Sequence, residues 1–550
     1  MKQNRLIIIL LLISSILMGI PFLVPGCGAV ALVALVPLLC AERIASFNGV
    51  KRFFWWYYLT FVIFNALTTW WVCKATVGGG IFAVLANSAF MSIIFALFRI
   101  SKKRFKGCVP YIFLAVAWIA WERFYLTSSQ ISWPWLVFGN AFGRTTGLVQ
   151  WYEYTGLLGG SLWVWLANLS IFGILVSLSD GSFRTWNRKA RYSAAVGLAL
   201  VIIGPIVCSK VIYSHYRERA DAGRLEVLMA QSNFDPYQKL KAVPQSAQNR
   251  QVVELFTEEL AGRDTLKAYP QEVTLLMLPE TFCSDIWVSS PKNSPTWRTF
   301  SKNLVDKYPN VNLLFGASTH QAFYTHASPS VLARPLGGGD GWYLSYNTAY
   351  MTDGTGRVER TDKTKLVVGS ELTPYPKVFA PIDDALGGLM GRCVSQGYAK
   401  NLNVVEYDED GTVSRCIPVG VPICYESIYP EFCTQYVRKG AQAICVITND
   451  GWWGNTAGYR QHFSYSRLRA IELRRDIARF ANTGISAFID QRGDVLEQSK
   501  WWTPDVLHAR INLTTKQTFF ALYGDIVGRL CYMMFALLFL TLIVKFITKK

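Results

Sequence analysis

The segment RLIIILLLISSILMGIP, residues 5–21, is apolar throughout except for Arg5 and two serines. A helix that crosses a bilayer needs about 20 mostly apolar residues. The same criterion predicts seven further spans, at 23–41, 53–73, 80–98, 109–126, 159–178, 193–213 and 528–547. Lys2 and Arg5 could instead begin a signal peptide. Because a second apolar stretch follows at once, a tight turn between two membrane helices is the better interpretation.

The composition agrees with a membrane protein. Of the 550 residues, 51% are hydrophobic, and the mean hydropathy is +0.23. The net charge of +18 comes from basic residues that cluster at the ends of apolar blocks. No zinc-finger spacing, basic helical arm or RNA-binding signature is present, so nucleic acid is excluded as a partner. The 12 cysteines and five histidines lack ligand spacing, and we expect neither a metal nor a cofactor.

The charges of the loops indicate how these spans are oriented. Cytoplasmic loops carry an excess of Lys and Arg. With the N-terminus inside, the basic loops should be the even-numbered ones, and they hold Arg43, Lys51, Arg52, Arg99, Lys102, Lys103, Arg104, Lys106, Arg184, Arg188, Lys189 and Arg191. The loops around 76–80 and 127–158 are nearly free of Lys and Arg, apart from Arg144, and Lys545, Lys549 and Lys550 return to the inside. Both termini are therefore predicted to be cytoplasmic.

The long stretch 215–527 must then face away from the cytoplasm. It alternates apolar runs with amphipathic helical patterns, as α/β domains do. Strands are predicted at Leu225–Ala230, Val273–Leu278, Asn312–Ala317, Val419–Cys424 and Ala443–Thr448, helices at 251–261, 296–306 and 459–480, and hairpin turns at Asp353-Gly354 and Arg492-Gly493. The sequence thus predicts a helical membrane domain at 1–214, an extracytoplasmic catalytic domain at 215–527, and a last span with a cytoplasmic tail at 528–550. An outer location would permit a disulfide between Cys393 and Cys416.

Three residues that can carry chemistry follow predicted strands. Glu280 ends Leu276-Met277-Leu278-Pro279-Glu280, at the sheet edge where α/β folds build their sites. Lys363 follows a strand, and Lys365 is a rival for its role. Cys424 lies where an apolar strand meets a sharp turn, which can favour a reactive thiolate. Taken singly, each has a plainer interpretation: a loop acid, a polar loop, and a buried structural cysteine such as Cys433 or Cys445.

Together, in this order, the three resemble the Glu-Lys-Cys triad of the carbon–nitrogen hydrolase (nitrilase) superfamily. Nearly the whole chain is similar to the apolipoprotein N-acyltransferase family within it. The shared motifs are Trp133-Pro134-Trp135-Leu136, Gln150 and Gly156, Gln231-Ser232-Asn233, Asn449-Asp450-Gly451-Trp452-Trp453-Gly454, Arg469-Ala470-Ile471-Glu472, Ala481-Asn482-Thr483-Gly484-Ile485-Ser486 and Tyr523-Gly524-Asp525. The resemblance implies eight transmembrane helices, with an α-β-β-α sandwich between the seventh and the eighth.

The resemblance also implies roles for individual residues. Glu280 would be the general base, Lys363 the oxyanion-stabilising cation and Cys424 the nucleophile, with Glu371, Tyr425 and Glu426 supporting them. Lys363 is preferred to Lys365 because the family lysine stands three residues before a Leu-Val pair. The family commonly reads Leu-Val-Pro-Phe-Gly-Glu, whereas this chain has Leu366-Val367-Val368-Gly369-Ser370-Glu371. That departure makes the alignment of Glu371, and any motion of its loop, less secure.

The activity implied by the family is the final step of lipoprotein maturation. A monomeric enzyme in the bacterial inner membrane, with its catalytic domain in the periplasm, would move an acyl chain from a phospholipid through a cysteine thioester to the α-amine of a diacylglyceryl-cysteine. A membrane-anchored amidase of the nitrilase type, with water as the acceptor, is the alternative. A transporter or receptor with an inactive outer domain is a third possibility, but repeated halves and broken helices are not seen.

Aromatic residues at the predicted membrane surface have two interpretations. Trp55, Trp56, Tyr57, Tyr58, Trp70 and Trp71 lie at the ends of the third span, as interfacial belts do. Trp133 and Trp135 could belong to such a belt or could line a lipid entry path with the loop 127–158. Glu122 and Arg123, near the outer end of the fifth span, could snorkel to the interface or serve the reaction.

Overall fold

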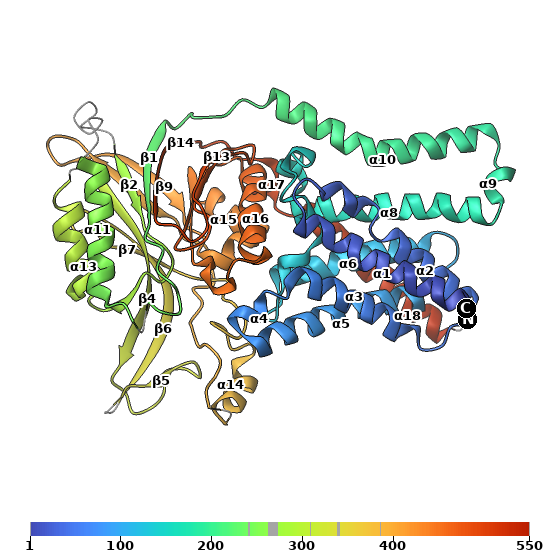
Figure 1. Ribbon diagram of the computed structural model, residues 1–550, viewed down its shortest axis with the longest axis horizontal. Coiled ribbons are helices and arrows are strands. Elements are labelled where there is room, and N and C mark those ends of the chain that lie inside the picture. The colour runs from blue at the N-terminus through green and yellow to red at the C-terminus, as the bar shows by residue number, and fades with distance from the viewer. Residues whose placement is uncertain are drawn as a thin grey trace.

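The computed structural model describes residues 2–239, 242–261, 273–308, 310–337, 341–385 and 387–548. A bundle of long helices lies beside an α/β part that contains the strands (Figure 1). The bundle is formed by α1 (Lys2–Leu23), α2 (Val36–Phe47), α3 (Phe53–Thr69), α5 (Val77–Ser101), α6 (Val109–Thr127), α8 (Leu157–Ser179), α10 (Arg188–His215) and α18 (Ile526–Ile547). The short helix α4 (Val72–Ala75) follows α3.

Within the described residues, seven helical segments are long and apolar enough to cross a membrane. Helix α3, with 17 residues, is not one of the seven, so the count of eight spans stays a prediction. The predicted second span, 23–41, is displaced along the chain. The chain turns at Pro25-Gly26, where Gly26 has a φ of +80°, and the apolar helical segment runs from Gly28 to Phe47.

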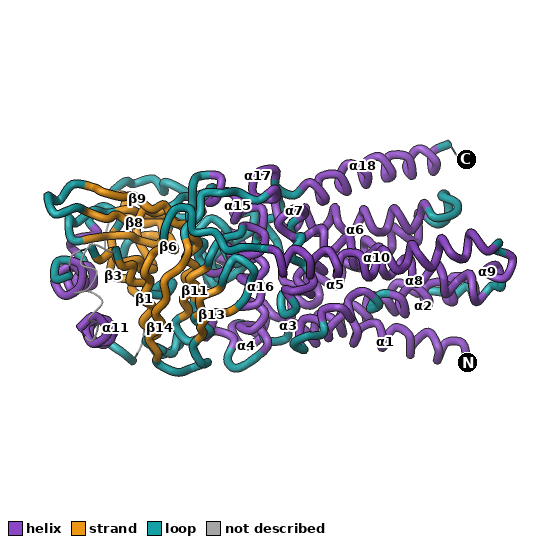
Figure 2. Tube along the Cα trace, turned by 90° about the horizontal axis from the view of Figure 1, so that it is seen from above, coloured by secondary structure: helices purple, strands orange, loops and turns teal. Residues whose placement is uncertain are grey.

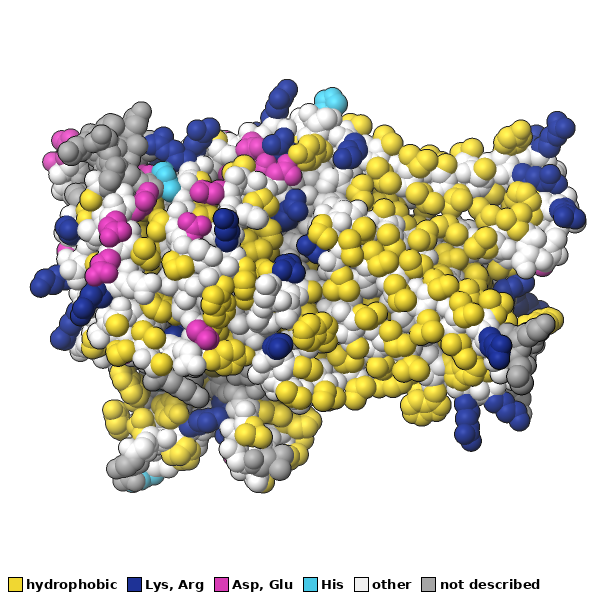
Figure 3. Space-filling view, viewed as in Figure 1, with side chains coloured by type: hydrophobic (Ala, Val, Ile, Leu, Met, Phe, Trp, Pro, Cys, Tyr) yellow, Lys and Arg dark blue, Asp and Glu magenta, His cyan; other side chains and the backbone are white. Residues whose placement is uncertain are grey.

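The surface of the bundle is mostly apolar, as lipid contact requires (Figure 3). Lys and Arg side chains gather at the end of the bundle remote from the strands, and both chain ends lie at that end (Figure 2). Lys549 and Lys550, which the sequence places on the cytoplasmic side, lie outside the described residues. The distribution of charge fits the predicted orientation, because basic residues favour the cytoplasmic face.

Two sheets form the centre of the α/β part. The first has the order β14 (Asp505–Asn512), β1 (Arg224–Gln231), β2 (Thr274–Met277), β4 (Val311–Phe323), β6 (Trp342–Asp353) and β5 (Arg334–Pro335), with β3 (Cys283–Trp287) beside β4 and β7 (Glu359–Asp362) beside β6. The second has the order β13 (Val495–Gln498), β12 (Ala487–Ile489), β11 (Ile477–Ala481), β10 (Ala443–Thr448), β9 (Val413–Gly420) and β8 (Leu402–Tyr407).

The sheets pack face to face between two layers of helices. Helices α11 (Gln245–Ala261) and α13 (Pro295–Phe300) cover the first sheet, while α15 (Pro430–Arg438) and α16 (Ala457–Leu473) cover the second and face the bundle (Figure 1). Val227, Leu275 and Ile417 are among the buried residues between the sheets. Burying one such side chain contributes roughly 1.5–3 kcal/mol. The layers are those of an α-β-β-α sandwich.

Two local predictions were wrong. The predicted strand Val419–Cys424 ends at Gly420, because Pro422 has no N–H to donate to a ladder. The predicted helix 459–480 ends at Leu473, Arg474 takes a left-handed φ of +47°, and 477–481 is the fully buried strand β11. Among the described residues all 12 cysteines are free, Cys393 and Cys416 included.

Candidate active site

Glu280 and Lys363 meet at the ends of β2 and β7. Oε1 of Glu280 accepts a 2.8 Å hydrogen bond from Nζ of Lys363, and Glu371 supplies a second carboxylate oxygen 3.0 Å from that nitrogen. Glu280 is 5% exposed and Lys363 is 1% exposed. Burial lowers the pKa of Lys363, but the charges of Glu280 and Glu371 outweigh it and raise that pKa well above its ordinary value. The Lys363 side chain is therefore an ammonium at neutral pH.

Asn347, on β6, ties these three residues together. Its Nδ2 donates to Oε1 of Glu280 at 2.8 Å and to Oε1 of Glu371 at 2.7 Å. Its backbone oxygen accepts from the backbone N–H of Lys363 at 2.8 Å. One amide thus fixes both carboxylates and the start of the lysine loop. Sequence reasoning missed Asn347, which stands in a long strand with no motif around it.

The turn that carries Glu280 is packed tightly against β4. A Cβ added to Gly316 would come within 2.7 Å of the Cα of Glu280, so glycine is required for this approach. The next residue, Thr281, has a φ of +45°. Its carbonyl oxygen accepts a 2.5 Å hydrogen bond from Nζ of Lys239, a side chain that is 5% exposed. Burial lowers the pKa of Lys239 to about 8, although Cys283 and Glu280 act in the opposite direction.

Cys424 begins a 3₁₀ turn, Cys424–Ile428, with a φ of +50°. A non-glycine residue in that region is strained by about 1–3 kcal/mol and needs support from its surroundings. The pKa of the thiol is raised well above its ordinary value, first by burial and then by the charge of Glu280, while Lys363 opposes them. The thiol is close enough to feel both charges, and it is protonated at rest. The charges of the buried Glu280–Lys363 pair thus act on the buried Cys424 thiol.

Glu426 joins the lysine loop to the cysteine turn. Its Oε1 accepts from the backbone N–H groups of Thr364 at 2.6 Å and Lys365 at 3.2 Å, and its Oε2 accepts from that of Ile423 at 2.7 Å. Burial raises the pKa of Glu426 to about 7, although these hydrogen bonds lower it. The side chain of Tyr425 contacts the loop after α6, where its hydroxyl donates to the carbonyl of Ser132 at 3.0 Å.

Lys365, the alternative to Lys363 in the sequence, lies outside this group. Nζ of Lys365 sits over the ring of Tyr429, 5.1 Å from its centre, whereas Lys363 contacts both carboxylates. The loop that departs from the family pattern still delivers Glu371, because Oε2 of that residue accepts a 2.8 Å hydrogen bond from the backbone of Val367. The geometry thus favours Lys363 and gives Glu371 a defined place.

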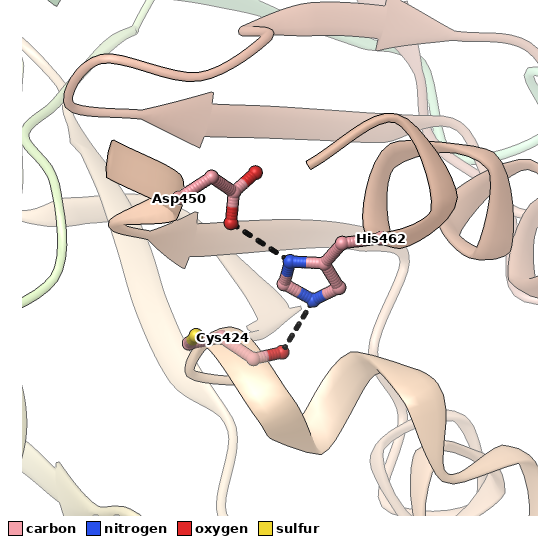
Figure 4. A group of neighbouring side chains, drawn as sticks. All are labelled: Cys424, Asp450 and His462. Atoms are coloured by element: carbon pink, nitrogen blue, oxygen red, sulfur yellow. Dashed lines mark hydrogen bonds and ion pairs between the residues drawn. The ribbon is translucent and has the colours of Figure 1, made fainter. Parts of the chain in front are cut away.

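A second buried group, Asp450, His462 and Arg479, supports the cysteine turn from the side of α16. Nδ1 of His462 lies 2.8 Å from Oδ1 of Asp450, and Nε2 lies 3.2 Å from the carbonyl oxygen of Cys424 (Figure 4). Arg479 donates to the other oxygen of Asp450 at 2.6 Å. Burial would raise the pKa of Asp450, but Arg479 and His462 lower it to about 2. Burial and the charge of Arg479 lower the pKa of His462, while the charge of Asp450 and the hydrogen bonds to Asp450 and Cys424 oppose them.

Cys424, Asp450 and His462 have the residue types of a metal site, and their ligand atoms lie within 4.8 Å of one another. Both carboxylate oxygens of Asp450 are already bonded, one of them to the Arg479 guanidinium. A cation placed there would be repelled by Arg479. The three residues fit a hydrogen-bonded support better than a metal cage.

Four tryptophans lie between the Asp450–His462–Arg479 group and the helical bundle. The ring of Trp135 lies 4.9 Å from Trp71, 5.5 Å from Trp453 and 5.5 Å from His462, while Trp133 lies 5.8 Å from Trp135. Trp135 and Trp71 are each 1% exposed, so neither belongs to a lipid-facing belt. Their burial corrects the belt interpretation for both, and for Tyr57, which is also 1% exposed.

The exposed rings of Trp55 and Trp70, at the two ends of α3, do suit an interfacial belt. Glu122 and Arg123, near the end of α6, make contacts inside the protein. Glu122 accepts from the backbone of Phe138 at 2.9 Å, and Arg123 pairs with Asp525 at 2.8 Å and with Glu431 at 3.0 Å. Neither residue snorkels to the interface, and Arg123 joins the bundle to the α/β part.

Comparisons with known proteins agree with this architecture. Residues 230–519 match the carbon–nitrogen hydrolase family, and residues 14–170 match the apolipoprotein N-acyltransferase N-terminal domain. The apolipoprotein N-acyltransferase of Chlorobaculum tepidum is 29% identical over 532 residues, which cover 94% of this chain and 93% of that protein. The apolipoprotein N-acyltransferase of Geobacter metallireducens is 24% identical over 542 residues, covering 94% and 92%. That of Haemophilus influenzae is 25% identical over 458 residues, covering 82% and 78%.

Proposed function

Because this chain belongs to the apolipoprotein N-acyltransferase family of the carbon–nitrogen hydrolase superfamily, we propose that it N-acylates bacterial lipoproteins. The donor would be a membrane phospholipid, and the acceptor the α-amine of an N-terminal diacylglyceryl-cysteine. The observation that carries this proposal is the buried Glu280–Lys363 pair, whose charges act on the Cys424 thiol. A base, an oxyanion-stabilising cation and a nucleophile are the parts that acyl transfer needs.

In the first half-reaction, Glu280 takes the proton of the Cys424 thiol as the sulfur attacks the ester carbonyl of the phospholipid. The raised pKa of the thiol supports this order, because a thiol that is protonated at rest needs a base. The carbonyl oxygen becomes an oxyanion, which the Lys363 ammonium stabilises. The ester C–O bond then breaks, and Glu280 returns its proton to the leaving alkoxide. A lysophospholipid departs and a thioester remains on Cys424.

In the second half-reaction, the α-amine attacks the thioester. Glu280 removes a proton from the amine, the C–S bond breaks, and the thiolate of Cys424 is protonated again. The product is an N-acylated lipoprotein, formed by a ping-pong sequence. Each oxyanion donor in such a site typically contributes a few kcal/mol to transition-state stabilisation. Glu371, Tyr425 and Glu426 act through the positions of Lys363 and Cys424.

The same triad could deliver the acyl group to water, as in the amidase alternative. The burial of Glu280, Lys363 and Cys424 supports an amine acceptor, since a thioester must survive until the second substrate arrives. Trp133, which keeps part of its ring exposed, would line the path of the lipid, and the buried Trp135 would support it. The clustering of Lys and Arg at the far end of the bundle supports a periplasmic catalytic domain in the inner membrane (Figure 3).

An N-acylation assay tests this function. A diacylated lipopeptide and a phospholipid are incubated with the purified protein, and the products are separated by mass. We expect N-acylated peptide and lysophospholipid in equal amounts with the wild type, and neither with Cys424→Ser. Release of free fatty acid without N-acylated peptide would establish the hydrolase instead.

A further inference from the structure

Arg144 is an exception to the charge pattern of the chain. It lies in the loop 127–158, which contains no other Lys or Arg. The structure places it at the end of α1 next to the α/β part, where its Nη1 donates a 2.7 Å hydrogen bond to the carbonyl oxygen of Leu23. Arg144 is thus a cation near the membrane surface whose hydrogen bond goes to a neutral carbonyl oxygen.

Three further cations lie around the same loop. Arg460 and Arg467, both on α16, are near enough for their charges to lower the pKa of Arg144, after the larger effect of burial. Lys210 projects from the last turns of α10, and its Nζ lies 3.3 Å from the place that a Cβ of Gly147 would occupy. Lys210 and Arg460 are exposed, and Arg144 and Arg467 are half-buried.

The hydrogen-bond acceptors of these arginines are neutral. Arg467 donates to the carbonyl of Gly493 at 2.7 Å and to the hydroxyl of Thr146 at 3.0 Å. Arg460 donates to the hydroxyl of Tyr459 and to Oδ1 of Asn455, each at 2.9 Å.

Within the described parts of the chain, none of the four cations has a carboxylate oxygen within 4.0 Å. The charges of Asp494 and Asp490 influence the pKa of Arg467, but Asp494 accepts from the Tyr213 hydroxyl at 2.6 Å and Asp490 pairs with Arg492 at 3.2 Å.

Other arginines at the same junction are neutralised within the protein. Arg123 pairs with Asp525 at 2.8 Å and with Glu431 at 3.0 Å, and Arg474 pairs with Glu153 at 3.1 Å. The cations around Arg144 thus differ from Arg123 and Arg474 in having no acidic partner among the described residues. A bound anion from outside the protein would partly neutralise these four cations.

We infer that Arg144, Lys210, Arg460 and Arg467 bind the phosphate of an anionic phospholipid. They lie where α1 and α10 leave the apolar bundle, which is the level of lipid headgroups. Figure 3 shows Lys and Arg side chains at this border between the apolar belt and the α/β part. Guanidinium groups bind phosphate oxygens with paired, charge-assisted hydrogen bonds. A lipid held here would link α1, α10 and α16 without touching Glu280, Lys363 or Cys424.

Lipid-dependent thermal unfolding of the full-length protein in non-ionic detergent tests this site. Phosphatidylglycerol is titrated against phosphatidylcholine, and the apparent affinity is read from the rise in Tm. The wild type should bind phosphatidylglycerol more tightly, and the variant R144Q/R460Q/R467Q should lose that preference. Each cation near a lipid surface contributes about fivefold in affinity. The control variant R250Q/R298Q/K302Q removes the same charge from exposed positions on α11, α13 and the turn after α13, and should keep the preference.

Two results would overturn the inference. One is a triple variant that retains the wild-type preference for phosphatidylglycerol. The other is a rise in Tm of the same size with inorganic phosphate, which would indicate an ion site with no role for the lipid. If the triple variant does not fold, Arg460→Gln alone, at an exposed side chain, should weaken binding about fivefold; unchanged binding by that variant would also count against the site.

Discussion

Nε2 of His462 lies 3.2 Å from the carbonyl oxygen of Cys424, and Oδ1 of Asp450 lies 2.8 Å from the other nitrogen of the same ring. The hydroxyl of Ser427 donates to that carbonyl at 2.7 Å. These contacts hold the backbone of a residue whose φ is +50°, and the ligand atoms of Cys424, Asp450 and His462 lie within 4.8 Å of one another. His462 is therefore a positioning residue, which acts through the conformation of Cys424.

Replacing His462 with Ala should slow acylation about tenfold in kcat with little change in KM, because the ring is fully buried and contacts the Cys424 carbonyl and the Asp450 side chain. That loss corresponds to about 1.4 kcal/mol. His462→Gln should restore part of the rate, since its amide can still donate to the carbonyl. Steady-state N-acylation gives both constants, and the alkylation rate of Cys424 with iodoacetamide reports the thiol directly. Equal kinetics in all three proteins would contradict the assignment.

Glu426→Gln should reduce activity by about 10- to 100-fold. The carboxylate accepts three backbone N–H groups from the lysine and cysteine turns, and charged acceptors form roughly twice as strong a bond as neutral ones. The N-acylation assay measures the loss, and far-UV circular dichroism shows whether the fold persists. Glu409→Gln, at an exposed position remote from the site, should behave as the wild type. A fully active E426Q protein would remove this residue from the positioning set.

The acylation rate should fall above about pH 8, where Lys239 loses its proton. Burial lowers the pKa of Lys239 to about 8, so the ammonium beside Thr281 is charged below that pH and neutral above it. A neutral amine donates a weaker hydrogen bond to the Thr281 carbonyl. Between pH 8 and about 10.5 Lys239 is protonated in the unfolded chain but neutral in the folded one. Its contribution to the free energy of unfolding therefore increases as pH rises, so the fall in rate is not caused by unfolding. Lys239→Arg should move the fall to higher pH; an identical profile would exclude Lys239 as its source.

Gly316→Ala should displace Glu280 and lower kcat at least about tenfold while the sheets persist. The new Cβ would come within 2.7 Å of the Glu280 Cα and 2.5 Å of the Pro279 carbonyl oxygen, both of them backbone atoms. Kinetics and circular dichroism on the same sample separate the two effects. Gly173→Ala, in α8, is the control, because nothing lies within 4 Å of its added Cβ. Full activity in G316A would show that the position of Glu280 is tolerant.

A phospholipid supplied without acceptor should leave an acyl group on Cys424. The expected observation is a mass increase equal to one fatty acid minus one water, on a peptide containing residue 424, that hydroxylamine removes. Lys363→Met should abolish the adduct, because the oxyanion then lacks its cation in a buried site. An acyl-peptide product without any detectable adduct, even at short times, would exclude the covalent pathway.

The sequence predicted the parts of the site that local motifs carry. Glu280 and Cys424 each stand after an apolar run, so their places near strand ends could be anticipated, whereas Lys363 follows the polar stretch Arg360-Thr361-Asp362. Asn347 and His462 could not, because their partners are set by tertiary packing. His462 is 38 residues from the carbonyl it faces, and Asn347 is 67 residues from Glu280. The histidines are scattered along the sequence, so their spacing did not indicate the contact between His462 and Cys424.

Some predicted boundaries of helices and strands were also wrong because tertiary packing decides them. Ile477–Ala481 continues a helical pattern, but it lies fully buried between β10 and β12 and forms a strand. Short buried apolar runs do not reveal their period. Trp135 and Trp71 follow the composition of an interfacial belt, and only packing against the α/β part removes them from lipid.

The pairing of β1 with β14 has a consequence for synthesis. Gln231 pairs with Asp505, so the first strand of the sheet must wait for a partner that is made 274 residues later. At roughly 5–20 residues per second, the delay is on the order of 15–60 s. During that time one edge of β1 is open to wrong partners. Synthesis through β14 therefore has to be finished before this sheet can close, and a chaperone would have most to protect in that interval.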